Sequence, residues 1–490
     1  MMVGARHAVP LRFTVHCLRI TSHESRITNY ESPFTIMIDL KNKKILILGL
    51  GVSGYAAALF LLKKGFSVKV SEKAGEEDIG GRIKELGRYG QFEYETRGHT
   101  GEFCSKADVA VISPGVHTKE LYDAGVLPVG MPAIGTLELG YMYCVSTVVA
   151  VTGTNGKSTV TELIGHMINA SGRKAVVCGN IGNPLIGEVA GLSPRDIAVV
   201  EVSSFQLGTI DSFRPHIAVL LNITEDHYDR HRGYEDYRSE KFKIFANQNG
   251  DDWAVINASF KGDEEIGRIK SGIVYFGKGK HRAEVSQKEV SINDESGANC
   301  FSIKEKDLSL SGIHNMENVA CAAIVGWILG ISAEVLVSAA ASFRPLKHRT
   351  EKVGVYEGIC FIDDSKATNI DATRRAVEST DGKIILIAGG RDKGGDYRSL
   401  TSLIKEKVKA VIVIGEAQTL IKEAFGGVVP VICSANMADA VRVSAERASR
   451  GDIIMLSPMC SSFDMFSGYR ERGDVFQREV KKQAGKDMSA

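Results

Sequence analysis

The sequence predicts an α/β protein of three domains, with mainly parallel sheets flanked by helices. Three observations lead to this class. Short apolar strands alternate with helical segments along most of the 490 residues, which is typical of buried parallel sheets. This pattern falls into three units, in agreement with the about two to four domains expected for such a length. Nearly every polar cluster directly follows an apolar strand, where open α/β sheets bind their ligands.

Residues 1–36 differ in composition from the rest of the chain. They contain four Arg, no Lys and two Glu, and no continuous apolar stretch of the kind found in signal peptides. An organelle transit peptide agrees with this composition. A disordered leader, or a start codon placed too early with Met37 as the natural beginning, is the simpler interpretation, because a complete first strand follows at 44–48.

The first unit, at 37–135, is expected to bind a nucleotide-containing substrate. Directly after the first strand, Gly49, Gly51 and Gly54 form the pattern G-x-G-x-x-G. Glu72 follows about 20 residues later, near the place where an acidic residue binds ribose in dinucleotide-binding folds. The motif is weak by itself, so it predicts the local strand–turn–helix structure better than it predicts the ligand.

The second unit, at 136–345, opens with a phosphate loop in "STVVAVTGTNGKSTV". Gly153 and Gly156 allow backbone N–H groups to approach phosphate oxygens, Lys157 can neutralise them, and Ser158 can ligate Mg²⁺. The loop is shorter than G-x-x-x-x-G-K-[ST], since only two residues separate its glycines. A plain strand–turn–helix connection is the alternative, but it would leave the run Gly-Lys-Ser-Thr after a valine-rich strand as a coincidence.

Acidic and histidine side chains follow the next strands of this unit. Glu201 ends the apolar strand "DIAVVEV", and Asp226, His227, Asp229 and His231 crowd the loop after "HIAVLLNIT". A glutamate or histidine in such a place, taken alone, is usually solvated. Beside a phosphate loop, a strand-end carboxylate is more often a second metal anchor. We therefore expect a metal or substrate site there.

The rest of the second unit contains two helical segments and one charged segment. In "YRSEKFKIF", Lys241 and Lys243 stand among apolar residues at helical spacing, which by itself would indicate lysines that extend along the surface to water. The charged segment 278–308 predicts hairpins and loops. "GIHNMENVACAAIVGWIL" predicts a strong amphipathic helix.

The third unit, at 346–490, follows a hinge in "FRPLKHRTEKVG". Its apolar strands run into "DDSKATN", "GGRDKGGDY" and "SPMCSSFDMF", so polar and glycine-rich loops again follow the strands.

The composition excludes several classes of protein. Lys and Arg total 60 against 59 Asp and Glu, which predicts no nucleic-acid or membrane-surface partner. Nine cysteines without a C-x-x-C pair indicate reduced thiols in a cytoplasmic protein, without a structural zinc site. No apolar run reaches the ~20 residues that a membrane span requires.

In their order along the chain, "GTNGKST", "EVSSFQL", "NITEDHYDRH", "HRTE", "DDSKATN" and "SPMCSSFDMFSGYRERGDVF" resemble the Mur ligases of peptidoglycan synthesis. The resemblance covers about residues 38–485, and the short phosphate loop is this family's own variant. It implies a Rossmann-like N-terminal domain, a central P-loop ATPase-like domain and a Rossmann-like C-terminal domain.

The resemblance also implies an activity. In this family, ATP phosphorylates a carboxylate of a UDP-muramoyl substrate, and an amine then attacks the acyl phosphate to form an amide, ADP and phosphate. "ILGLGVSG", "ISPGV" and "GGRDKGGDY" are similar to the member that adds D-glutamate to UDP-N-acetylmuramoyl-L-alanine. The implied partners are these small molecules and ATP, with two Mg²⁺ ions, and a monomer is expected.

The resemblance assigns site residues by their matching positions. Lys157, Glu201, His227 and Lys241 would be catalytic, and Lys241 would carry a carbamate. The Mg²⁺ ligands would be Ser158, Glu201, His227 and Lys241. ATP would be bound by Gly153, Thr154, Asn155, Gly156, Lys157, Ser158, Thr159, Asn315, Asn318, His348, Arg349 and Asp364. The muramoyl substrate would be bound by Ser53, Ser113 and Gly115 of the first unit, which would be the UDP-substrate-binding domain, and by Asn180. The pocket for D-glutamate would be formed by Thr368, Lys393, Ser462 and Phe463. Lys366 and Tyr469 would be further substrate-binding residues.

Three alternatives remain open at this point. A dinucleotide-dependent oxidoreductase would explain the first glycine motif and would require nicotinamide-dependent activity. Another Mur ligase or a folylpolyglutamate synthase-like ligase would attach a different amino acid, although the D-N-P-R-type motif usual for diamino acids is absent from the sequence. An inactive nucleotide-binding regulator would retain the fold without the chemistry, but Lys157, Glu201, His227 and Lys241 argue against it.

Overall fold

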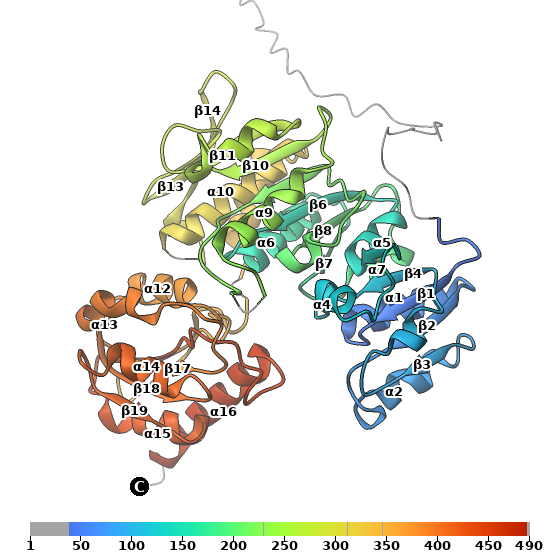
Figure 1. The fold of residues 1–490 in the computed structure, drawn as a ribbon. Helices are drawn as coiled ribbons and strands as arrows, with labels where there is room; N and C mark the ends of the chain where they lie inside the picture. Colours follow the sequence, from blue (N-terminus) through green and yellow to red (C-terminus); the bar gives the residue numbers. More distant parts are fainter. Residues whose placement is uncertain (1–38, 229, 311, 345, 488–490) are drawn as a thin grey trace, which may run out of the picture. The chain divides into compact units, whose positions relative to one another are not determined.

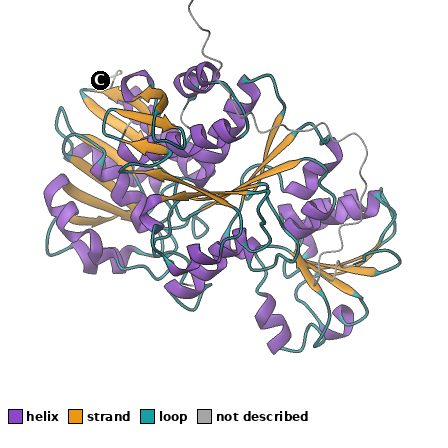
Figure 2. Cartoon of the chain, turned by 90° about the horizontal axis from the view of Figure 1, so that it is seen from above, coloured by secondary structure: helices purple, strands orange, loops and turns teal. Residues whose placement is uncertain are grey.

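The computed structural model describes residues 39–228, 230–310, 312–344 and 346–487. The predicted leader at 1–36 and Asp229 lie outside the described residues. The chain forms three sheets with helices packed against them (Figures 1 and 2), which confirms the predicted α/β class with mainly parallel strands.

The first sheet is parallel throughout, in the order β3-β2-β1-β4-β5. Four of the five residues of its central strand are buried, as the apolar run predicts. Gly54 is required at the following turn, because a Cβ there would lie 1.8 Å from the Gly49 carbonyl oxygen. The elements are β1 Lys44–Leu48, α1 Val52–Lys63, β2 Ser67–Ser71, α2 Glu76–Leu86, β3 Glu93–Glu95, α3 Gly101–Cys104, β4 Val109–Ile112, α4 Thr118–Asp123, β5 Ala133–Gly135 and α5 Thr136–Met142.

The second sheet has the order β14-β13-β12-β11-β10-β9-β6-β8-β7. Its last three strands pair as antiparallel hairpins within the charged segment, as predicted. Two strands that the sequence analysis did not identify, β10 and β11, extend the parallel part. The strands are β6 Thr147–Thr152, β7 Ala175–Gly179, β8 Ile197–Glu201, β9 Ile217–Leu220, β10 Trp253–Asn257, β11 Gly272–Gly277, β12 Ala283–Val285, β13 Glu289–Asn293 and β14 Asn299–Lys304.

The helices of the second unit cover both the phosphate loop and the hairpins. The helix predicted in "GIHNMENVACAAIVGWIL" is α10, whose buried residues join α6 in one hydrophobic core. Its predicted amphipathic character is wrong, because every residue from 318 to 326 is buried and the helix is therefore enclosed on all sides. The α-helices are α6 Lys157–Ala170, α7 Leu185–Glu188, α8 Ser204–Leu207, α9 Tyr234–Phe242, α10 Ile313–Ile328 and α11 Ala333–Ser342, and a 3₁₀ turn, η2 Lys243–Phe245, follows α9.

The third sheet has the order β15-β16-β20-β17-β18-β19 and is parallel except for the β15–β16 hairpin. Its elements are β15 Glu351–Tyr356, β16 Ile359–Asp363, α12 Ile370–Glu378, β17 Ile384–Gly389, α13 Thr401–Lys407, β18 Val408–Ile414, α14 Gln418–Phe425, β19 Val431–Cys433, α15 Met437–Arg447, β20 Ile453–Leu456 and α16 Tyr469–Asp487.

The register of the second sheet brings the predicted site residues to one edge. Val151 of β6 pairs with Glu201 of β8, and Thr152 of β6 pairs with Leu220 of β9. The three strands therefore end side by side. The phosphate loop, the Glu201 carboxylate and the loop that carries His227 all begin at this edge.

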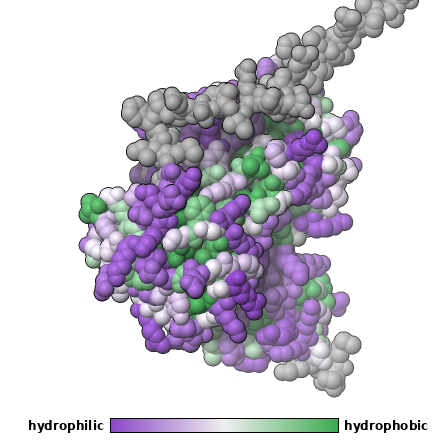
Figure 3. Space-filling view, turned by 90° about the vertical axis from the view of Figure 1, so that its right-hand side faces the viewer, coloured by the Kyte–Doolittle hydropathy of each residue, from purple (hydrophilic) through white to green (hydrophobic). Residues whose placement is uncertain are grey.

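On the face drawn in Figure 3, hydrophobic residues form small patches between hydrophilic ones. Within the described ranges, no helix combines the length and apolarity that a membrane crossing needs.

The eight described cysteines are all free thiols, as predicted.

Candidate active site

The phosphate loop adopts the left-handed turns that its glycines allow. Gly156 has φ 87°, and a Cβ there would lie 2.6 Å from Asn318 Oδ1 on α10. Asn222, which follows β9, holds the loop by accepting from the Asn155 backbone N–H at 2.8 Å and donating to the Asn155 carbonyl at 3.0 Å. The sequence analysis did not identify Asn222, although it too directly follows an apolar strand.

Two lysines, the partly buried Lys157 and the buried Lys241, meet at one carbonyl oxygen of this loop. Lys157 Nζ donates to the carbonyls of Gly153 and Thr154 at 2.9 and 2.8 Å, and Lys241 Nζ donates to the same Gly153 carbonyl at 2.8 Å. Burial, and then repulsion from Lys157, lowers the pKa of Lys241 well below its usual value. Lys241 is 1% exposed, so a lysine that extends along the surface is the wrong interpretation.

Glu201 has one carboxylate oxygen without a partner. Its Oε1 accepts from Asn180 Nδ2 at 2.7 Å, whereas Oε2 is buried and, in the described part of the chain, receives no hydrogen bond. Burial would raise the Glu201 pKa, but Lys366 and Lys157 hold it below the usual value. An ionised carboxylate with a buried free lone pair is suited to a cation.

His227 lies in the same region as a neutral imidazole. Burial, and then repulsion from the nearby Lys393, lower its pKa to about 3. Its backbone has φ 58° and its N–H donates to the Asp226 carboxylate at 2.9 Å. Asp226 Oδ1 also lies 3.3 Å from Lys393 Nζ, a contact between distant sequence segments that the sequence analysis did not predict.

A first pocket lies between the phosphate loop and α10. Asn315 and Asn318, two of the predicted ATP ligands, line it, and Asn318 Nδ2 donates to Asn315 Oδ1 at 3.2 Å. Asn257 and Phe276 also line it, from the ends of the two strands β10 and β11 that were missed. The other predicted ATP ligands that line this pocket are Asn155, Gly156, Arg349 and Asp364.

The neighbouring residues His348 and Arg349 were both predicted to bind ATP, but their side chains lie in different surroundings. Arg349 lines the first pocket. Its buried Nε–H group donates no hydrogen bond to any described residue. The His348 ring instead lies 2.7 Å from Asp363 and does not line this pocket. Nearby, burial raises the pKa of Asp364 to about 7, and Lys366 Nζ lies 4.1 Å from the centre of the Tyr469 ring.

A second pocket lies at the carboxyl edge of the first sheet. It is lined by Ser53, Ser113, Gly115 and Asn180, all predicted to bind the muramoyl substrate, and by Glu72. Because Asn180 also contacts Glu201, one residue connects this pocket with the candidate metal ligand.

A third pocket surrounds Lys393 and is lined also by Asp226 and Met459. Among the described residues that line it, the predicted D-glutamate ligands Thr368, Ser462 and Phe463 do not occur. Ser462 is 2% exposed and Phe463 is 65% exposed, so the two neighbours have opposite surroundings. The structure thus brings Lys393, but not these three residues, to this pocket.

The residues at the phosphate loop fit a hard divalent cation. Ser158 and Glu201 offer a hydroxyl and an ionised carboxylate oxygen, the ligand types that Mg²⁺ prefers. Neutral His227 can also ligate a metal, although nitrogen is a less typical ligand for Mg²⁺. Unmodified Lys241 would not be a ligand, because its amine is bound to a carbonyl.

Comparisons with known proteins agree with this architecture. Models of the "Mur ligase MurD-like, N-terminal domain", the "Mur ligase middle domain" and the "Mur ligase, glutamate ligase domain" match residues 43–135, 151–326 and 348–460. The UDP-N-acetylmuramoylalanine–D-glutamate ligase of Desulfatibacillum aliphaticivorans is 41% identical over 90% of this chain and 99% of its own length. The chain belongs to the Mur ligase family. A relative of the same name from Pelotomaculum thermopropionicum is 40% identical to this Mur ligase over 90% of the chain and 98% of its own length.

Solved structures share the fold of this Mur ligase at low identity. The UDP-N-acetylmuramate–alanine ligase MurC of Thermotoga maritima is 19% identical, with a TM-score of 0.58 over 90% of this chain and all of that one. MurF of Acinetobacter baumannii is 16% identical, with a TM-score of 0.59 over 84% of this chain and 90% of its own.

Proposed function

We propose that this protein joins D-glutamate to UDP-N-acetylmuramoyl-L-alanine, with ATP, in the synthesis of peptidoglycan precursors. The observation that carries the proposal is the identity of about 40% over nearly the full length of relatives named as this ligase. The first, second and third pockets would bind ATP, the muramoyl substrate and the amino acid, respectively. Action as a monomer in the cytoplasm belongs to the same proposal.

The reaction requires an activated carboxylate. The carboxylate of the muramoyl-alanine substrate attacks the γ-phosphorus of ATP, which releases ADP and forms an acyl phosphate. The amine of D-glutamate attacks the acyl carbon, the tetrahedral intermediate expels phosphate, and the nitrogen loses a proton. Because several anions meet in these steps, cationic groups that are fixed in advance provide most of the stabilisation.

The chain's own residues suit these steps. Lys157 would exchange its loop carbonyls for phosphate oxygens, and Arg349, with its free buried Nε, would contact the same phosphates. Ser158 and Glu201 would hold Mg²⁺, with His227 and a carbamylated Lys241 at a second ion. When bound, Mg²⁺ supplies charge neutralisation at the transferring phosphoryl group. Asn180 would orient the muramoyl substrate beside Glu201.

Lys393 is proposed to bind the side-chain carboxylate of D-glutamate. Lys393→Ala is therefore expected to raise the KM for D-glutamate about ten- to hundredfold, because a charge-assisted hydrogen bond contributes ~1.5–3 kcal/mol. Steady-state kinetics with each substrate varied in turn measure this change. Lys409, which pairs with Asp452 elsewhere in the third unit, provides the control Lys409→Ala. An unchanged KM for D-glutamate in Lys393→Ala would contradict the assignment.

A further inference from the structure

Arg349 stands between two residues in an unfavourable backbone conformation. His348 has φ 62° and Thr350 has φ 46°, both in the left-handed region. β-Branched and bulky residues rarely adopt this region, so the surrounding contacts must hold the turn. The turn matters because Arg349, its middle residue, lines the pocket beside the phosphate loop.

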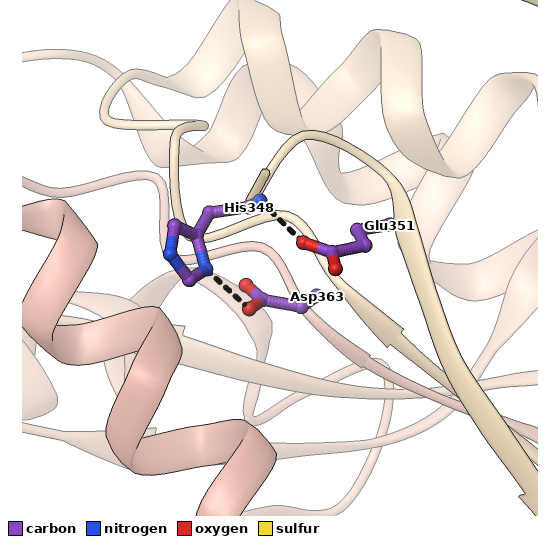
Figure 4. A group of neighbouring side chains, drawn as sticks. All are labelled: His348, Glu351 and Asp363. Carbon is purple, nitrogen blue, oxygen red and sulfur yellow. Dashed lines mark hydrogen bonds and ion pairs between the residues drawn. The ribbon is translucent and has the colours of Figure 1, made fainter. Parts of the chain in front are cut away.

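Contacts on both the ring and the backbone hold His348, among them a 3.5 Å approach of ring Nε2 to Asp474 Oδ1 on α16 and a hydrogen bond from the Lys366 backbone N–H to the His348 carbonyl. The His348 ring Nδ1 lies 2.7 Å from Asp363 Oδ2, and its backbone N–H donates to Glu351 Oε2 at 2.7 Å (Figure 4). Gln477 of α16 donates from Nε2 to the same two carboxylate oxygens, at 3.1 Å to Glu351 and 2.9 Å to Asp363. One amide group of α16 therefore connects both carboxylates that fix His348.

A second residue of α16 provides the space for the ring. A Cβ at Gly473 would lie 2.1 Å from His348 Nδ1, and 2.7 and 2.8 Å from two ring carbons. Only glycine can stand there while the ring keeps its place. A glycine inside a helix lowers the stability of the helix. The close approach of the His348 ring is a physical reason for glycine at position 473 despite this cost. Gly473 and Gln477 lie four residues apart, on one face of the helix.

His348, Glu351 and Asp363 could also be considered as a metal site, because their ligand atoms lie within 4.8 Å of one another. The hydrogen bonds argue against it. Gln477 Nε2 already donates to both carboxylates, and an amide donor in that position would repel a cation. The His348–Asp363 distance of 2.7 Å is that of a charge-assisted hydrogen bond.

We propose that Gly473 and Gln477, which we call the α16 seat, position Arg349 for the triphosphate of ATP by holding the His348 turn. This inference rests on the proposed use of ATP. The seat residues do not line the first pocket, so they are positioning residues. His348 acts in the same way, through Arg349, rather than as a nucleotide contact.

Two variants of the full-length protein test the seat by different physical means. Gly473→Ala places a methyl group against the ring, and Gln477→Met keeps the side-chain length but removes both donors. Both are expected to weaken ATP binding at least tenfold in calorimetric titrations and to raise the KM for ATP similarly. The KM for D-glutamate should change less than twofold. Gly485→Ala and Gln483→Met, on the same helix, are matched controls, and Gly485 has open space for a Cβ.

The outcomes separate this inference from the proposed function. ATP binding is measured without an amino acid, so it does not depend on which amino acid is ligated. If Gly473→Ala does not fold, Gln477→Met decides the test. ATP affinity equal to wild type in a folded Gln477→Met variant overturns the proposal. An equal loss of affinity for ATP and D-glutamate also overturns it, because it would indicate general structural damage.

Discussion

Replacement of Lys241 by alanine is expected to reduce turnover by at least about 100-fold, as when one preorganised charge-stabilising group is lost. Lys241 and Lys157 both point at the Gly153 carbonyl, and burial favours an uncharged Lys241 amine. An unprotonated amine can react with CO₂ to give a carbamate, which is an anion that could ligate Mg²⁺. The proposed carbamate would thus place an anion beside the Lys157 cation, in place of an uncharged amine. Steady-state phosphate release measures the loss, and circular dichroism checks the fold.

Chemical rescue separates the carbamate from a structural role of Lys241. A short acid such as acetate, at high concentration, should restore part of the Lys241→Ala activity, whereas chloride at equal ionic strength should not. Lys243 is the matched control, because it begins η2, is only partly buried and pairs with Glu240. Near wild-type turnover in Lys241→Ala, together with loss in Lys243→Ala, would show that the family match is out of register here.

Glu201→Gln is expected to lower the apparent affinity for Mg²⁺ by about 10- to 100-fold or more. The change keeps the size of the side chain but removes the negative charge of the carboxylate. In the described structure, Oε2 of this carboxylate has no hydrogen-bond partner. Activity measured against Mg²⁺ concentration should shift to higher concentrations and recover in part at the highest ones.

Glu162 provides the control for this variant. It lies on α6, close enough for its carboxyl to interact with Glu201, and burial raises its pKa. Glu162→Gln should therefore leave the Mg²⁺ dependence near that of wild type. If the two variants had equal Mg²⁺ dependence, Glu201 would act through general electrostatics and not as a ligand.

Much of the fold could be predicted because continuous apolar runs mark buried parallel strands. The strands that end at Thr152, Glu201 and Leu220 were found in this way, and parallel pairing then places their polar ends at one edge. The apolar runs of β10 and β11, "WAVIN" and "GIVYFG", carried the same signal and were overlooked. With them, Asn257 and Phe276 could have been proposed for the first pocket.

The directions of individual side chains could not be predicted from motif order. His348 and Arg349 are neighbours in the sequence, yet the His348 ring lies against Asp363, whereas the Arg349 side chain lines the first pocket. The cause lies in Gly473 and Gln477, more than 120 residues later. The contact between Asp226 and Lys393 likewise depends on tertiary structure. The two residues lie far apart in the sequence, so no local spacing pattern predicts it.

The most direct test of the proposed function is an amino-acid panel with UDP-N-acetylmuramoyl-L-alanine, ATP and Mg²⁺, with phosphate release as the readout. D-Glutamate is expected to drive rapid release, because Lys393 offers a cation for its side-chain carboxylate. L-Glutamate, D-alanine and meso-diaminopimelate should give little, and omission of ATP should abolish the reaction. Phosphate release with meso-diaminopimelate equal to that with D-glutamate would contradict the account.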